Sequence, residues 1–267
     1  MGRISLRLAA SLIPFVLAAL VPARAAAQEK PCVITIAAAS DLTDAMKEIV
    51  TGFEKNTACA VRLSMGSSGN FLTQIENGAP FDLFFSADIE YPRKLEAEGL
   101  AVPGSVYLYA LGKIVLWVRN DSHLDIAGGL EILRDPAIQK VSIANPEHAP
   151  YGRAAQDALK KAGVYDAIKG RLVLGENISQ AAQFVESGNA DAGIVALSLA
   201  LSPEMRDKGR YWPIPENLYA PIQQGAVLIR ASRNPQAARA FLDYIKTPPV
   251  SALLQRYGFA LPGKGRS

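Results

Sequence analysis

Histidine and cysteine, which supply most transition-metal ligands and many catalytic groups, are scarce in this sequence. The chain has two histidines, His123 and His148, and two cysteines among its 267 residues. Neither histidine has a second His, Cys or Glu at the spacing of a metal site. The sequence also lacks a G-x-S-x-G elbow, a P-loop and a G-x-G-x-x-G motif. It therefore gives no support to a zinc enzyme, an α/β-hydrolase or a nucleotide-binding protein.

The composition shows no bias toward a non-globular class. Hydrophobic residues make up 49% of the chain and charged residues 20%, with 21 Gly and 17 Pro. These values exclude a collagen-like chain, a coiled-coil rod, a disordered tail and a small disulfide scaffold. The length is sufficient for one large domain or two lobes with a sizeable core.

Residues 1–27 have the pattern of a cleavable signal peptide. Arg3 and Arg7 form a charged start, residues 8–21 form an apolar stretch, and small residues allow cleavage after Ala25 or Ala27. The apolar stretch is too short to span a bilayer comfortably. The cleavage region has no cysteine, which disfavours lipoprotein attachment, and no later stretch is apolar enough for a transmembrane helix. We therefore expect an exported protein.

The formal net charge of +3 comes from this leader. Residues 1–27 contain Arg3, Arg7 and Arg24 and no acidic residue, so their removal leaves 25 basic against 25 acidic side chains. The mature protein is then neutral. A neutral chain lacks the electrostatic basis of nucleic-acid binding.

The two cysteines precede two predicted strands. Cys32 stands directly before the apolar run 33–36, and Cys59 directly before the run 60–63. If these are neighbouring parallel strands, both thiols lie at the same end of the sheet, within reach of a disulfide in an oxidising compartment. Two free thiols are the alternative. Compartment and position favour the bridge.

Alternating strand-like and helix-like patterns predict an α/β fold. In the first half, strands are expected at 33–37, 61–65, 82–86, 107–110 and 113–119, with helices at 41–55 and 71–77 and a further helix ending at 97. After a restart, strands are expected at 141–144, 171–173, 192–197 and 225–230, and helices at 152–162, 179–187, 235–245 and 250–259. Such β/α runs indicate mostly parallel sheets flanked by helices.

Two β/α blocks predict two lobes. We expect residues 28–111 plus 224–267 to form the first lobe and residues 112–223 the second, with the chain crossing near Gly112 and again near 222–225. Two crossings make a two-strand hinge. A ligand is then expected in the cleft between the lobes.

Small polar residues occupy four predicted strand-to-helix junctions, at 38–42, 66–70, 145–152 and 176–179. Each junction directs unpaired backbone N–H groups and a positive helix end toward the cleft. The first two junctions contain neither Arg nor Lys, which suits an anion held by dipoles and hydrogen bonds. The alternative is purely structural: Ser40 serves as an N-cap, and Gly66 and Gly69 relieve their turns.

At these junctions the sequence resembles the periplasmic molybdate-binding proteins of bacterial ABC importers. The matching stretches cover nearly the whole mature chain, at 37–40, 66–69, 75–88, 145–152, 193–197 and 256–259. The resemblance implies a two-lobed type II periplasmic-binding-protein fold and no enzymatic activity. It implies no cofactor, a ligand that is molybdate or tungstate, a periplasmic location, and a monomer. The implied partners are an inner-membrane permease and its cytoplasmic ATPase, with no nucleic acid.

The resemblance also implies the binding residues. Ser40 and Ser68 would donate through hydroxyl and backbone N–H groups, Asp41 through its backbone N–H, and Tyr151 and Ile178 through backbone N–H groups of the second lobe. Ser40, Ser68, Tyr151 and Ile178 would then hold molybdenum only as molybdate, through its oxygens.

The site departs from the family at one position and contains one acid. Some relatives have a tyrosine that contacts the oxyanion where this chain has Ala196. The Asp41 carboxylate is expected to face away from the anion, because it would repel a dianion. Two alternatives stay open: a binding protein for another tetrahedral oxyanion such as sulfate, and a serine hydrolase that uses Ser40 or Ser68, with His148 as a base for Ser68.

Overall fold

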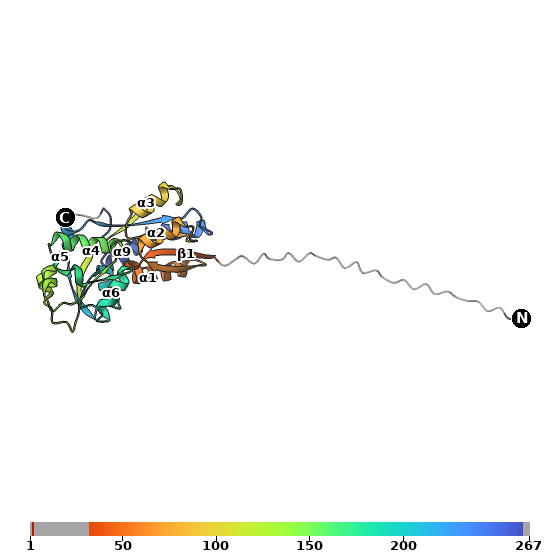
Figure 1. The fold of residues 1–267 in the computed structure, drawn as a ribbon. Helices are drawn as coiled ribbons and strands as arrows, with labels where there is room; N and C mark the ends of the chain where they lie inside the picture. The colour runs from red at the N-terminus through yellow and green to blue at the C-terminus, as the bar shows by residue number, and fades with distance from the viewer. Residues whose placement is uncertain (1, 3–31, 264–267) are drawn as a thin grey trace. The chain divides into compact units, whose positions relative to one another are not determined.

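The computed structural model describes residue 2 and residues 32–263, and residues 32–263 form one compact unit (Figure 1). Apart from residue 2, the predicted signal peptide at 1–27 lies outside the described residues. Within the described ranges, no helix has the length and hydrophobicity needed to cross a membrane.

The first sheet has five strands in the order β2-β1-β3-β10-β4. Its strands are β1 (Cys32–Ala39), β2 (Cys59–Gly66), β3 (Leu83–Ser86), β4 (Tyr107–Gly112) and β10 (Ile222–Leu228). The helices that accompany it are α1 (Thr43–Asn56), α2 (Ser68–Glu76), α3 (Glu90–Ala97), α8 (Pro235–Ile245) and α9 (Pro248–Arg256). In Figure 1 the C-terminal helix α9 lies beside the N-terminal helix α1, which it contacts.

Alternation along the strands explains why helices cover both faces of this sheet. Ile34 and Ile36 of β1 pack in one apolar cluster with α1, α8 and α9. Ala37 and Phe84 point the other way, into a cluster with residues of α2 and α3. Because successive side chains of a strand face opposite sides, a strand buried on both faces reads as a continuous apolar run.

The second sheet also has five strands, in the order β7-β6-β8-β5-β9. Its strands are β5 (Ile114–Arg119), β6 (Val141–Ala144), β7 (Leu172–Gly175), β8 (Ala192–Ala196) and β9 (Gly209–Pro213). The accompanying α-helices are α4 (Pro150–Lys161), α5 (Tyr165–Ile168), α6 (Ile178–Glu186) and α7 (Leu197–Ala200). Short 3₁₀ helices complete the described residues: η1 (Ser40–Leu42), η2 (Ile126–Arg134), η3 (Lys169–Arg171) and η4 (Glu216–Leu218).

The predicted α/β class is confirmed, and both sheets prove to be mixed. Each contains two parallel and two antiparallel pairings. The pairs β1–β2, β1–β3, β6–β7 and β6–β8 are parallel, whereas β4, β5, β9 and β10 run antiparallel to their neighbours. Strand β9 was not predicted, because it lies in a segment rich in proline that includes Pro203, Pro213, Pro215 and Pro221. It is an edge strand paired with β5 alone and ends at Pro213, a position that an edge strand tolerates.

The chain passes between the two sheets twice, from β4 to β5 through Lys113 and from β9 to β10 through η4. The predicted boundary between 111 and 112 precedes the last residue of β4, and the predicted boundary between 223 and 224 falls inside β10. The lobe boundaries themselves stay a prediction.

The predicted disulfide is present. Cys32 and Cys59 are bonded, with their Cα atoms 4.6 Å apart. They are register partners at the starts of the parallel strands β1 and β2, so the bridge joins two strands that already pair in the sheet.

Loss of this bridge should reduce the free energy of unfolding by about 3 kcal/mol, because a closed loop of this length restricts the unfolded chain. Urea unfolding with and without reductant measures the difference. The double variant Cys32→Ser/Cys59→Ser is the control and should unfold at the same lower midpoint in both conditions. Equal midpoints for oxidised and reduced wild-type protein would contradict a stabilising bridge.

Candidate functional site

One small cavity lies where four helix N-termini meet. It has a volume of about 10 Å³, far too small for a drug-sized molecule. All five residues predicted from the sequence line it. The complete lining is Ala39, Ser40, Asp41, Gly66, Ser67, Ser68, Ala87, Ala149, Pro150, Tyr151, Asn177 and Ile178.

Each junction places the start of a helix at the cavity. The helix η1 begins at Ser40 directly after β1, α2 begins at Ser68 after β2, and α6 begins at Ile178 after β7. The fourth helix, α4, begins at Pro150, whose fixed φ suits the first helical position. The first N–H groups of a helix have no partner within it, so these four ends offer donors to a ligand.

The cavity combines donors with an absence of cationic side chains. Its lining residues include no Lys, Arg or His. The cavity is also secluded from solvent, since 3% or less of the surface is exposed in each of four lining residues, Ser40, Ser68, Tyr151 and Ile178. In such a place an anion is stabilised by oriented N–H dipoles and helix ends rather than by ion pairs.

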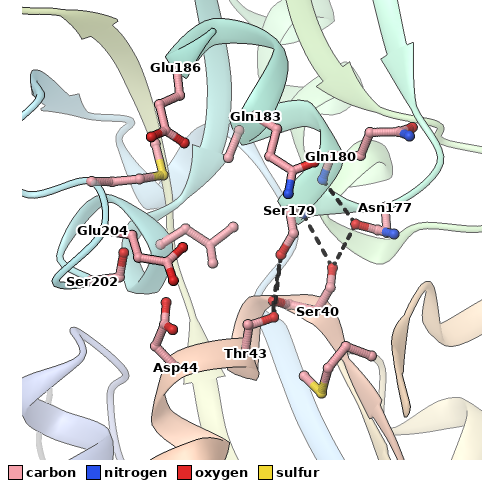
Figure 2. A pocket seen from close by; sticks show the side chains of 14 residues that line it. Ser40, Thr43, Asp44, Asn177, Ser179, Gln180, Gln183, Glu186, Ser202 and Glu204 are labelled. Atoms are coloured by element: carbon pink, nitrogen blue, oxygen red, sulfur yellow. Dashed lines mark hydrogen bonds between the residues drawn. The ribbon is translucent and has the colours of Figure 1, made fainter.

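The two predicted serines differ in how their hydroxyls are used. Ser68 Oγ accepts a hydrogen bond from the backbone N–H of Ala87 at 2.9 Å, which leaves its own hydrogen to be donated. Ser40 Oγ donates to Asn177 Oδ1 at 3.1 Å and accepts from the N–H of Ser179 at 3.3 Å (Figure 2). Ser40 was also an N-cap candidate, and this is wrong, because Ser40 is the first residue of η1 and Ala39 is the N-cap.

Asn177 ties this arrangement to α6. Its side-chain oxygen accepts the N–H of Gln180 at 3.0 Å and so caps the helix that begins at Ile178. The Ser40 carbonyl oxygen in turn accepts bonds from Ser179 Oγ at 2.8 Å and from Thr43 Oγ1 at 2.6 Å. The first and fourth junctions of the chain are therefore held together directly.

A second pocket, shown in Figure 2, lies on the other side of Ser40 and Asn177. The carboxyl groups of Asp44, Glu186 and Glu204 line it. An acidic surface disfavours a bound anion. The cavity on the inner side of Ser40 is therefore the better oxyanion site.

The Asp41 side chain belongs to a buried hydrogen-bond network. Its Oδ2 accepts from the Tyr151 hydroxyl at 2.9 Å and from Gln224 Nε2 at 2.6 Å. Gln224 Oε1 accepts from the Tyr109 hydroxyl at 2.7 Å. Among the described residues, Asp41 Oδ1 has no hydrogen-bond partner and is buried. Burial raises the pKa of Asp41 to about 7, and the bonds from Gln224 and Tyr151 oppose this rise.

Tyr151 therefore uses its two polar groups differently. Its hydroxyl is engaged by Asp41 and also accepts from Gln224 Nε2 at 2.8 Å, whereas its backbone N–H lies in the first turn of α4. Ala196, at the end of β8, is fully buried and is not among the residues that line the cavity.

Further bonds join segments of the two sheets around the cavity. The His148 carbonyl accepts from the N–H of Gly69 at 2.9 Å, and a Cβ at Gly69 would lie 2.6 Å from that oxygen. Arg153 of α4 donates to Asp88 Oδ2 at 2.7 Å and to the Tyr91 hydroxyl at 2.9 Å. The cavity is thus closed in this structure.

The geometry does not assemble a serine hydrolase. The His148 ring Nε2 bonds the Glu176 carbonyl at 2.9 Å, and Ser68 Oγ bonds Ala87, so the two side chains are engaged separately. Within the described residues there is no group of three or more His, Cys, Asp or Glu side chains that could hold a metal ion.

The sequence analysis missed three residues of the site: Ser67, Asn177 and Gln224. Asn directly before a helix is a recognisable N-cap signal, so Asn177 was within reach. Gln224 is a fully buried polar residue of β10, and such a residue needs a polar partner. The sequence contains no sign of which partner it finds.

Comparison with known proteins places this geometry among transport proteins. The family described as bacterial extracellular solute-binding protein matches residues 34–260. The molybdate-binding protein ModA of Azotobacter vinelandii is 43% identical over 85% of this chain and 90% of its own. ModA of Rhodobacter capsulatus is 40% identical over 96% of both chains.

Solved structures agree with these sequence relatives. The periplasmic molybdate-binding protein of A. vinelandii has a TM-score of 0.81 and 35% identity, and the match covers 86% of this chain and 99% of that one. The sulfate-binding protein SubI of Mycobacterium tuberculosis matches with a TM-score of 0.70 over 87% and 88% of the two chains. At 17% identity, the second match shows a shared fold alone.

Gly112 provides a test of the buried network. A Cβ added there would collide with the Tyr151 hydroxyl and lie 2.8 Å from Gln224 Nε2. Gly112→Ala should therefore lower the free energy of unfolding by about 2 kcal/mol through overpacking. Urea unfolding measures the change, and Gly170→Ala, whose Cβ would meet nothing within 4 Å, is the matched control. If the two variants were equally stable, the side chains of Tyr151 and Gln224 could move aside without cost, and the predicted overpacking would be wrong.

Proposed function

We propose that this chain, which belongs to the bacterial extracellular solute-binding proteins and to the molybdate-binding proteins among them, captures molybdate for an ABC importer. The observation that carries the proposal is the secluded cavity lined by helix N-termini and hydroxyl groups without a cationic side chain. Relatives at 40–43% identity that are molybdate-binding proteins support the choice of ligand.

The ligand would be held from both lobes. Backbone N–H groups of Ser40, Asp41 and Ser68 approach it from the first lobe, and those of Tyr151 and Ile178 from the second. The Ser68 hydroxyl adds a donor, because its oxygen already accepts from Ala87. A tetrahedral dianion has oxygens on all sides, so its binding favours closure of the lobes. No donor comes from position 196, since Ala196 has no polar side chain.

The finer assignments follow from this proposal. Tungstate should be a second ligand, because its charge and shape match those of molybdate. The mature protein would act as a monomer in the periplasm after removal of residues 1–27. It would then deliver the anion to an inner-membrane permease that a cytoplasmic ATPase drives, and it would perform no chemical reaction.

Ser68→Ala should weaken molybdate binding roughly ten- to hundredfold, because a hydrogen bond to a charged group contributes on the order of 1.5–3 kcal/mol. Isothermal titration calorimetry measures the affinity. The matched control is Ser142→Ala, a fully buried serine of β6 whose hydroxyl donates to the Ala181 carbonyl at 2.8 Å, away from the cavity. The control should lose stability but keep its affinity. Unchanged affinity in Ser68→Ala would remove Ser68 from the site.

Selectivity among oxyanions tests the function as a whole. Molybdate and tungstate at about a hundred times their dissociation constants should stabilise the fold by about 2.7 kcal/mol, a melting shift of roughly 5–10 °C. Phosphate keeps a proton at neutral pH and needs an acceptor for it; Asp41, the one acidic residue of the lining, has its Oδ2 engaged by Tyr151 and Gln224 and would repel the anion if it were ionised. Sulfate carries no proton, but its oxygens lie too close together to reach donors on both lobes. A thermal-shift assay in which either ion equals molybdate would contradict the proposal.

A further inference from the structure

Asp41 is the one acidic residue among those that line the oxyanion cavity. Only 2% of its surface is exposed to solvent, and its Oδ2 accepts hydrogen bonds from Tyr151 of α4 and Gln224 of β10. Its carbonyl oxygen accepts from Ser198 Oγ of α7 at 2.7 Å, so groups from three other elements enclose the residue. Tyr151 and Ser198 belong to the predicted second lobe and Gln224 to the first, so closure of the second lobe onto η1 completes the enclosure of Asp41.

Every polar group that faces the Asp41 carboxyl is uncharged. Two tyrosines lie around the carboxyl group, Tyr151 from α4 and Tyr109 from β4, and Tyr219 lies near Tyr151. The other two polar neighbours, Gln224 of β10 and Ser198 of α7, do not titrate. Burial raises the pKa of Tyr109 and of Tyr151 well above 10, so both hydroxyls stay protonated at neutral pH. Among the described residues, the hydrogen-bond partners of the carboxyl group are Tyr151 and Gln224, and none is a lysine, arginine or histidine. An ionised Asp41 would lack a counter-charge.

We propose that Asp41 takes up a proton when the lobes close around the oxyanion, so that a neutral carboxyl lies beside the bound dianion. The inference rests on the proposed function and concerns the same cavity. It assigns Asp41 a positioning role: the side chain joins Tyr151 to Gln224 across the lobes, and its protonation removes the repulsion that would otherwise oppose the ligand.

The atoms of the network can accommodate this proton. Oδ2 accepts both hydrogen bonds, while Oδ1 is buried without a partner among the described residues. A proton on Oδ1 leaves the bonds from Tyr151 and Gln224 intact. It also replaces a bare negative oxygen with an O–H donor, the kind of group that the rest of the cavity presents.

The direction of the pH effect follows from the two states. In open lobes water reaches the carboxyl, whose pKa is then near its ordinary value of about 3.9. In the closed structure burial raises the pKa to about 7 against the opposing hydrogen bonds from Gln224 and Tyr151, and the charge of a bound dianion raises it further. The bound state thus holds one more proton than the open state at pH 6–7. By linkage, affinity falls as pH rises, by up to about tenfold per pH unit in this range.

The test is titration with molybdate at pH 6.5 in buffers that differ in ionisation enthalpy. The slope of the observed heat against that enthalpy gives the number of protons taken up, which should be close to one for the wild-type protein. Asp41→Asn keeps an oxygen that accepts from Tyr151 and Gln224 but cannot titrate, and it should take up none. Asp44→Asn, in the first turn of α1 and outside the network, is the matched control and should behave as wild type.

The possible results separate the two ideas. Tight binding without proton uptake, or uptake that persists in Asp41→Asn, overturns the role of Asp41 and leaves the proposed function standing. Absence of heat with both molybdate and tungstate in the wild-type protein overturns both. Infrared difference spectra of the wild-type protein add a test that needs no folded variant. A protonated carboxyl C=O band should appear on molybdate binding, and its absence counts against the proposal.

Discussion

The cavity must stabilise an anion without a cation, and much of the structure follows from that constraint. Backbone N–H groups are available in number only where a helix begins, because elsewhere in helices and sheets they are already bonded. Four helices therefore have to start at one point. The two β/α lobes achieve this because strands β1, β2, β6 and β7 end on the cavity side, where η1, α2, α4 and α6 begin.

Seclusion from water makes these weak dipoles effective, and the contacts between the lobes provide it. Ser40 bonds Asn177 and Ser179, Gly69 bonds the His148 carbonyl, and Arg153 bonds Asp88. Each of these bonds needs its donor and acceptor within hydrogen-bond distance, so all of them belong to the closed arrangement of the two lobes. The acidic pocket of Figure 2 lies outside this seal, and its carboxylates are kept from the oxyanion cavity by Ser40 and Asn177.

Much of the fold and site could be predicted because the relevant signals are local. Small polar residues after an apolar strand mark a helix start, so the junctions at 38–42, 66–70 and 176–179 were located from short patterns. The family resemblance then implied Ser40, Ser68 and Ile178 as binding residues, and that resemblance is confirmed. The Cys32–Cys59 bridge followed from the position of each cysteine before a strand. By contrast, β9 was missed because prolines hid an edge strand, and Gln224 because its partners are 73 and 183 residues away.

Asp41 shows where local reasoning stops. From the sequence, an acid in the first turn of a helix is expected to favour the helix N-terminus and to turn away from a bound anion. In the folded chain the same residue is enclosed by α4, α7 and β10, and its carboxyl joins Tyr151 to Gln224. A carboxylate in that position has two acceptor oxygens but only one that is bonded, so ionisation is disfavoured by burial and left half-compensated by hydrogen bonds. Asp41 therefore becomes a proton-sensitive part of the cavity through Tyr151, Ser198 and Gln224, three partners that are remote in the sequence and that no local pattern reveals.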